Sequence, residues 1–168
     1  MSFLELAKAR YSCRKFTEQA VEDEKIAKIL EAAMCAPTAV NKQPFKVWVV
    51  KSAENLEKVK STTHYSFDAK VILVLGGKRE AAWVRPFDNR NFADVDASIV
   101  GTQMMLEAHD LGLGSTWVGY FDAPKLAELL PDMADYDLIA LFPLGYPAMG
   151  PSPRHSESKS EAELVRYI

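Results

Sequence analysis

The amino-acid sequence predicts a mixed fold of the α/β or α+β class. Helical and strand patterns alternate along its 168 residues, with no internal repeat and no low-complexity linker. A chain of this length buries a substantial core, and its 48% hydrophobic and 26% charged residues are typical of a soluble globular protein. We therefore expect a single domain spanning residues 1–168.

Two helices are expected in the first forty residues. Ser2 and Glu5 have the spacing of a capping box, which predicts a short N-terminal helix. The second helix is the clearest in the sequence, because acidic residues 22–24 suit its positive end and apolar residues repeat on one face from 26 to 34. Pro37 then prevents its continuation.

The central part of the chain predicts two strands and one helix. Residues 46–51 form a β-prone run too short for a core helix, and a helix capped by Ser52 follows. Residues 71–75 predict a buried strand that ends at the glycine pair 76–77. The segment 78–92, rich in Arg, Asn and aromatic residues, is expected to be irregular.

The C-terminal half repeats the alternation. A long helical pattern from 94 to 111 stops at Gly112, and residues 116–118 predict a short strand. A helix capped by Asp122 and a strong strand at 138–144 complete the pattern. Residues 147–168 form a proline-bounded polar tail with an apolar end; such a tail is either disordered or laid across another surface, for which a partner subunit is the natural candidate.

Charge and composition argue against several functions. The formal net charge of −3 does not provide the dense basic surface that nonspecific nucleic-acid binding needs. No apolar run approaches the roughly 20 residues that cross a bilayer, and we expect no secretory signal and no membrane partner. Cys13 and Cys35 are expected to be free thiols in a reducing cytoplasm, and the separated His64, His109 and His155 predict no metal site.

Two polar segments near the N-terminus are candidates for ligand binding. Arg10, Ser12 and Arg14 alternate, so in an extended chain their side chains converge on one side, where arginine suits a phosphate. The alternative is that Arg10 complements the C-terminal end of a helix while Arg14 is a solvated surface charge. The loop after the second helix carries Thr38, Asn41 and Gln43, whose hydroxyl and amide groups suit a flavin edge but are also ordinary loop residues.

Glycines at 112–119 resemble a phosphate-binding loop only superficially, because their order is helix then strand. Gly112 is first a helix terminator, whereas Gly119 lets the backbone approach a flat ligand.

These segments together resemble the FMN-dependent nitroreductase family. The family pattern R-x-S-x-[RK] matches residues 10–14, and A-P-[ST]-x-x-N-x-Q-P-[WF] matches residues 36–45. G-L-G-[ST]-x-W-[IV]-G matches residues 112–119, and a strand leading to G-Y-P matches residues 145–147. The four motifs occur in family order across nearly the whole chain.

The resemblance implies an α+β fold with a central, mostly antiparallel sheet flanked by helices, in an intertwined homodimer with two FMN at its interface. We expect the tail, residues 147–168, to pack on the partner subunit, and Arg154 resembles the tail residue of the family that reaches the phosphate. The implied FMN-binding residues are Arg10, Ser12, Arg14, Pro37, Thr38, Asn41, Gln43, Trp117, Val118, Gly119 and Arg154. Several members of the loop 37–43 would come from the partner. One departure is the tail sequence 152–154, which has Ser-Pro-Arg where many members have Lys-x-Arg, so His155 or Lys159 is a candidate replacement.

The implied activity is an NAD(P)H-dependent flavin oxidoreductase. Hydride would pass from NAD(P)H to flavin N5 and then to a small flat acceptor, a nitroaromatic or a quinone, in a ping-pong cycle. The chemistry lies on the cofactor, so no side chain is expected to be catalytic. A reductive dehalogenase and a non-catalytic flavin-binding protein are the alternatives. The chain is short for the family, and segment 83–92 stands where longer members roof the substrate pocket.

Overall fold

The structure, a computed structural model, describes residues 2–168. Its α-helices are α1 (Phe3–Ala9), α2 (Asp23–Met34), α3 (Ala53–Lys60), α4 (Ala93–Asp110), α5 (Ala123–Leu129) and α6 (Glu161–Leu164). Its strands are β1 (Phe45–Val50), β2 (Val71–Gly77), β3 (Gly114–Ser115) and β4 (Asp137–Gly145). Single 3₁₀ turns are η1 (Ala39–Asn41), η2 (Arg79–Ala81), η3 (Pro131–Met133) and η4 (Pro153–Ser156).

Local capping chemistry sets several helix ends where the sequence predicts them. Ser2 and Glu5 form the complete capping box, with the Glu5 carboxylate 2.7 Å from the Ser2 nitrogen. The side chains of Ser52 and Asp122 accept backbone N–H bonds at the starts of α3 and α5. Gly112, at φ 76°, takes the left-handed conformation that ends α4.

The four strands form one antiparallel sheet in the order β1-β2-β4-β3. β2 and β4 are its central strands, and every residue of β2 is buried. Val74 lies opposite Trp48 of β1 and Leu141 of β4, which defines the register at the sheet centre. This confirms the α+β class and the antiparallel sheet that the family resemblance implies.

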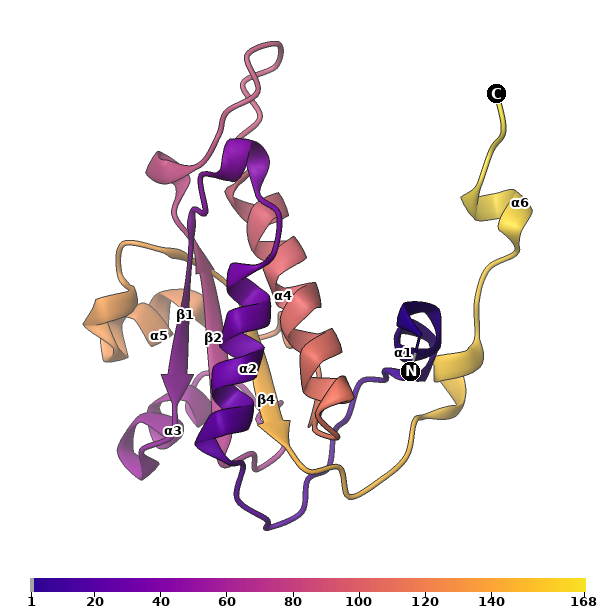
Figure 1. Ribbon diagram of the computed structural model, residues 1–168. Helices are drawn as coiled ribbons and strands as arrows, with labels where there is room; N and C mark the ends of the chain where they lie inside the picture. The colour runs from indigo at the N-terminus through magenta and orange to yellow at the C-terminus, as the bar shows by residue number, and fades with distance from the viewer. Residues whose placement is uncertain (1) are drawn as a thin grey trace.

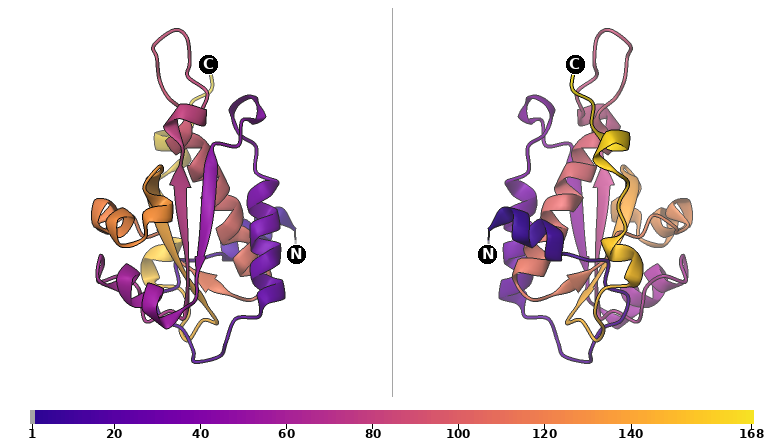
Figure 2. Two further views of the ribbon diagram at one scale, coloured as in Figure 1. Left: turned by 90° about the vertical axis from the view of Figure 1, so that its left-hand side faces the viewer. Right: turned by 90° about the vertical axis from the view of Figure 1, so that its right-hand side faces the viewer.

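Helices cover both faces of the sheet (Figures 1 and 2). Because side chains alternate along a strand, Leu73 and Phe142 pack toward α2 and α4, whereas Val74 and Leu141 pack toward α3 and α5. Each such side chain contributes about 1.5–3 kcal/mol on full burial. The two apolar layers thus hold the sheet from both sides.

The two ends of the chain lie outside this layered body (Figure 1). No residue of α1 or α6 is buried, and the apolar side chains of Phe3 and Leu164 are 72% and 62% exposed. Residues 10–17, which we call the strap, run from α1 along the sheet edge. Residues 147–156 of the tail run beside them, joined by a bridge between Phe16 and Pro147.

One predicted strand is misplaced. Residues 116–118 do not form a strand; β3 lies at 114–115, and Val118 makes only an isolated bridge to Leu141. The register is kept, since Ser115 lies opposite Leu144 and Val118 opposite Leu141, and it places Thr116 opposite Pro143. Because proline has no backbone N–H to donate, the ladder is interrupted at this position.

The glycine pair 76–77 and the segment 78–92 also differ from expectation. Both glycines belong to β2, and a Cβ at Gly76 would lie 3.0 Å from the Trp48 ring, so glycine lets the aromatic ring approach the strand. The segment expected to be irregular contains η2 and a projecting hairpin. A Val84–Asn91 bridge and an Arg85-to-Arg90 backbone hydrogen bond of 2.9 Å close this hairpin (Figure 1).

Candidate functional site

Charged residues of the strap and the tail converge on one cleft of about 280 Å³, which we call the anion cleft. Its lining residues are Arg10, Tyr11, Ser12, Arg14, Ser152, Arg154 and His155. The structure therefore brings together the alternating strap residues and the tail arginine, which are some 140 residues apart in sequence.

The strap is held mainly by backbone contacts, and the one side-chain hydrogen bond of its arginines within residues 2–168 joins the Arg14 guanidinium to the Ser12 carbonyl at 3.4 Å. Ser12 bridges Ser115 of β3, and the Cys13 N–H donates to the Ser115 carbonyl at 3.0 Å. Gly114 permits this approach, since a Cβ there would lie 2.6 Å from the Cβ of Cys13. On the other side, the Ala148 N–H donates to the carbonyl of residue 15 at 2.9 Å. The strap is thus clamped between β3 and the tail.

Tyr11 joins the strap to both the tail and α4. Its hydroxyl donates to the Met149 carbonyl at 2.8 Å. Its ring lies edge-on to His109 of α4 and to His155 of the tail, with centroids 6.1 and 6.2 Å away. Partial burial raises the pKa of Tyr11, so its hydroxyl remains a proton donor at neutral pH.

The anion cleft carries uncompensated positive charge. Within residues 2–168 no ion pair involves Arg10, Arg14 or Arg154. Burial, followed by the charge of Arg10, lowers the pKa of His109, which keeps its imidazole neutral at pH 7. Three guanidinium groups without carboxylate partners, around one cleft, suit an anion with several acceptor oxygens such as a phosphate.

A second cleft, of about 210 Å³, adjoins the anion cleft through Arg14, which lines both. We call it the ring cleft. Its other lining residues are Tyr65, Phe67, Thr116, Trp117, Val118, Gly119 and Tyr120. It contains all three residues that the sequence predicts around a flat ligand at 117–119.

Backbone and aromatic groups shape the ring cleft. No hydrogen bond within residues 2–168 uses the N–H of Gly119, and a Cβ there would meet only the Trp117 indole nitrogen, at 3.8 Å. Tyr65 lies edge-on to Tyr120, with centroids 5.7 Å apart, and Phe67 holds a left-handed φ of 51° in the same loop. A flat aromatic ligand would find ring edges and a free backbone donor here.

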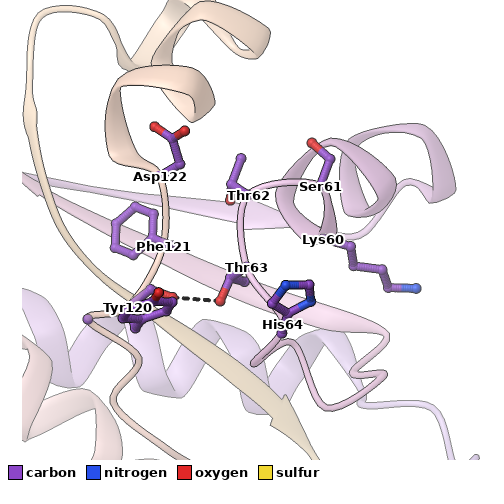
Figure 3. A pocket seen from close by; sticks show the side chains of 9 residues that line it. Lys60, Ser61, Thr62, Thr63, His64, Tyr120, Phe121 and Asp122 are labelled. Carbon is purple, nitrogen blue, oxygen red and sulfur yellow. Dashed lines mark hydrogen bonds between the residues drawn. The ribbon is translucent and has the colours of Figure 1, made fainter.

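A polar hollow of about 480 Å³ lies beside the ring cleft and shares Gly119 and Tyr120 with it. Figure 3 shows its wall, where the Thr63 hydroxyl donates to the Tyr120 carbonyl at 2.6 Å. The hydroxyls of Ser61 and Thr62 also donate to backbone carbonyls. With these donors already used, the hollow suits a phosphate less well than the anion cleft does.

The loop at 37–43, which we call the amide loop, is tightly constrained. Val40, Asn41 and Gln43 have φ values of 47°, 53° and 49°. A β-branched residue such as Val40 rarely adopts that conformation, and persistent backbone strain often marks a functional segment. The Thr38 hydroxyl oxygen accepts from the Gln43 N–H at 3.0 Å, which holds the loop from within.

Asp96 of α4 holds the amide loop from below. Its carboxylate is 1% exposed and accepts from the Ala39 N–H at 2.9 Å, while its second oxygen has no partner within residues 2–168. The exposed side chains of Asn41 and Gln43 remain available above. The sequence offered no sign of this clamp, because Asp96 appears there only as an acidic residue in the first turn of a helix.

The chain does not bring the amide loop to the two clefts. The amide loop sits at the N-terminal end of α4, at Asp96, whereas the strap pairs with Ser115, beyond its C-terminal end. α4 has 18 residues, which places these ends about 27 Å apart. The predicted residues thus form two groups, one of which contains Pro37, Thr38, Asn41 and Gln43.

Several lining residues escape sequence reasoning. Tyr65, Phe67 and Tyr120 line the ring cleft, and Tyr11 lines the anion cleft. The only signal for them is the density of aromatic residues beside the motif at 117–119 and between α3 and β2. Of the two candidates for the missing tail lysine, His155 lines the anion cleft and Lys159 does not.

Other predicted features can be located in the part of the chain that the structure describes. Cys13 is buried, Cys35 is exposed, and both are free. Burial raises the pKa of the Cys13 thiol. Across residues 2–168, no three His, Cys, Asp or Glu side chains cluster as a metal site would require. No helix in this range has the length and apolar character to span a membrane.

Comparison with known proteins gives consistent relatives. The nitroreductase family matches residues 7–72 and 62–146 of the chain. A protein of Methanothermobacter thermautotrophicus, assigned as an NADH dehydrogenase/NAD(P)H nitroreductase, is 34% identical over 99% of this chain and 88% of its own length.

Solved structures agree with these sequence matches. A nitroreductase family protein of Clostridium difficile is 38% identical, with a TM-score of 0.91 over 99% of this chain and 98% of its own. A protein of Desulfovibrio desulfuricans, assigned as a nitroreductase and solved in complex with FMN, is 31% identical, with a TM-score of 0.82 over 98% and 95% of the two chains.

Proposed function

The chain belongs to the nitroreductase family, and on that premise we propose that it is an FMN-dependent oxidoreductase that uses NAD(P)H to reduce a small flat acceptor such as a nitroaromatic or a quinone. The observation that carries this proposal is the meeting of the anion cleft and the ring cleft at Arg14. A phosphate-binding end and a flat aromatic-lined end, joined by one arginine, match the two chemical halves of FMN. The FMN complex of the Desulfovibrio relative supports the same cofactor.

The residues present fit FMN at both ends. Unpaired Arg10 and Arg154 would hold the phosphate, with Ser12 as a hydroxyl partner. The free N–H of Gly119, with the backbone of Trp117 and Val118, would line the isoalloxazine ring. When bound, FMN would supply the two-electron hydride chemistry of a ping-pong cycle between NAD(P)H and the acceptor.

The protein groups contribute binding and electrostatics rather than proton transfer. Arg14, which lines both clefts, would place its fixed positive charge beside the ring edge where negative charge develops on reduction. Tyr65 and Tyr120 would bound the flat acceptor from the solvent side of the ring cleft. The open ring cleft would admit nucleotide and acceptor in turn.

A second copy of the chain would complete the site. Pro37, Thr38, Asn41 and Gln43 lie at the far end of α4 from the clefts, so in a homodimer the partner's amide loop would reach the flavin. The exposed apolar side chains of the tail, among them Tyr167 at 85%, would pack on that partner. Under this proposal residues 1–168 form one FMN-binding domain and 147–168 its intersubunit tail.

Two measurements test the proposal. Titration of the purified protein with FMN, followed by flavin fluorescence, should show saturable binding, and NADH or NADPH should bleach the bound flavin anaerobically. Oxidised flavin that neither nucleotide reduces would indicate the non-catalytic alternative, and no flavin binding would overturn the proposal. Light scattering should give twice the mass of one 18.7 kDa chain; a single-chain mass would reject the dimer.

A further inference from the structure

His155 lines the anion cleft beside Arg154, on the 3₁₀ turn η4 of the tail. Its Nε2 lies 3.0 Å from the Lys8 carbonyl oxygen, and its ring stands edge-on to Tyr11. A carbonyl oxygen only accepts, so Nε2 carries the hydrogen, and Nδ1 is the nitrogen whose protonation changes the charge of the ring. The backbone contact therefore orients the ring and leaves its charge free to vary.

The surroundings of His155 contain cations without carboxylate partners. The charged and titratable side chains around it are Arg10, Tyr11 and Arg14 on the strap, His109 with the adjacent Asp110 on α4, and Arg154 on its own turn. Lys8 of α1 meets His155 through its backbone carbonyl. Within residues 2–168 none of these cations forms an ion pair. A proton on His155 adds a fourth positive charge to the cleft, which an anion in the cleft compensates.

We propose that His155 is a phosphate ligand whose protonation makes the affinity of the cleft for the phosphate monoester of FMN depend on pH. This inference rests on the proposed function and adds a regulation to the same site. In its protonated form, Nδ1 donates a charge-assisted hydrogen bond to a phosphate oxygen while Nε2 keeps its bond to Lys8. Without that proton, Nδ1 can only accept a hydrogen bond, and the contact with the phosphate is lost.

Ionisation of the phosphate has the opposite effect on FMN affinity. Its second ionisation, near pH 6, makes the phosphate more negative and therefore favours binding as the pH rises. The contribution of His155 is therefore measured as the ratio of the FMN dissociation constants of a variant and the wild type at the same pH. His155→Gln keeps an amide donor for the Lys8 carbonyl and carries no charge. His155→Lys carries a positive charge across the whole range.

The experiment measures the FMN dissociation constant of the full-length wild type and both variants at about pH 5.5 and about pH 8. At the lower pH, His155→Gln should bind FMN about tenfold more weakly than the wild type, the value of one charge-assisted hydrogen bond. At the higher pH the two should agree within about twofold. His155→Lys should match the wild type at the lower pH and bind more tightly than it at the higher pH.

Riboflavin, which lacks the phosphate, is the matched probe. Its affinity should be the same for all three proteins at both pH values. A His155→Gln effect on FMN that is equal at both pH values would overturn the proposal, and so would an equal effect on riboflavin. Wild-type protein that binds no FMN would overturn the proposed function together with this inference, whereas FMN binding without the pH-dependent ratio overturns only the inference.

Discussion

The strap and the amide loop, the two halves of the proposed cofactor site, are held in opposite ways. The strap is a largely half-buried segment clamped through its backbone, by β3 on one side and the tail on the other. Its arginine side chains have no ion-pair partners within residues 2–168. The amide loop holds three residues at left-handed φ above a buried carboxylate, Asp96.

This difference means that the strap contributes mainly to ligand affinity, whereas the amide loop carries the backbone strain. In the strap, Arg10 and Arg14 have no ion-pair partner within residues 2–168, and Arg14 makes only a 3.4 Å hydrogen bond to the Ser12 carbonyl, so most of their N–H groups are available to an anion. In the amide loop, the fold already holds the unfavourable backbone shape that presents Asn41 and Gln43, so binding need not impose it. Substitutions in the strap should therefore change affinity first, and substitutions beneath the amide loop should change local stability first.

The largest expected effect is on FMN affinity at the strap. Arg10→Ala should weaken FMN binding by about 1.5–3 kcal/mol, the value of a hydrogen bond to a charged group, or roughly 10- to 150-fold in the dissociation constant. Its urea midpoint should stay at the wild-type value. Lys28→Ala, on the exposed face of α2, removes the same charge elsewhere and should leave FMN affinity unchanged. If Arg10→Ala bound FMN as tightly as the wild type, the phosphate site proposed in the anion cleft would be wrong.

Breaking the clamp of the strap should affect stability as well as affinity. In Gly114→Ala the new Cβ would lie 2.6 Å from the Cβ and 2.7 Å from the Sγ of Cys13. Such overpacking costs about 1–3 kcal/mol of unfolding free energy, measurable by urea denaturation. Gly150→Ala in the tail, where no atom lies within 4 Å, is the control and should remain within about 0.5 kcal/mol of the wild type. Equal midpoints for both variants would contradict the clamp.

A smaller effect is expected at the amide loop. Asp96→Ala removes the acceptor of the Ala39 N–H but also relieves the burial of the unpartnered carboxylate oxygen, so the net loss should be about 1 kcal/mol. Amide hydrogen exchange at Ala39 should accelerate, while exchange in β2 stays slow. Asp94→Ala, whose exposed carboxylate lies 3.7 Å from Arg79, is the matched control and should leave exchange at Ala39 as it is. If the Ala39 amide of Asp96→Ala exchanged as slowly as in the wild type, the role of Asp96 in holding the amide loop would be contradicted.

The smallest effect is a pH dependence at His109. Burial lowers its folded-state pKa below the unfolded value of about 6.5, so below that pH the unfolded chain binds the proton more readily. The contribution of neutral His109 to the free energy of unfolding should be fully present above about pH 6.5 and should be lost as the pH drops through the folded-state pKa. Urea midpoints at about pH 7.5 and about pH 5.5 should differ less in His109→Gln than in the wild type. An identical difference in both proteins would assign the pH effect to other groups.

Local chemistry explains why most elements are predictable from sequence. The Ser2, Ser52 and Asp122 caps are satisfied within three residues of each helix start, so their effect does not depend on the rest of the fold. The same holds for Gly112, whose left-handed φ ends α4. The strand expected at 116–118 is interrupted because its partner in β4 at that register is Pro143, a pairing that only the tertiary fold decides.

The candidate site shows the same division. The alternation of Arg10, Ser12 and Arg14 is visible in the sequence, but their convergence with Arg154 requires the tail to fold back along the strap. Tyr65 and Tyr120 meet in the ring cleft from loops 55 residues apart, which no local pattern reveals. Side chains that touch only through the tertiary fold leave no periodic signal in the chain.

By itself, the sequence determined the α+β class, the helix ends and the family motifs, because capping, periodicity and chain-breaking residues act over a few neighbours. The tertiary structure alone decided that Arg14 joins two clefts, that Asp96 lies beneath the amide loop and that His155 faces the anion cleft. It also decided that the strap and the amide loop lie at opposite ends of α4. The physical reason is that burial, close approach and uncompensated charge are properties of surfaces brought together from distant parts of the chain.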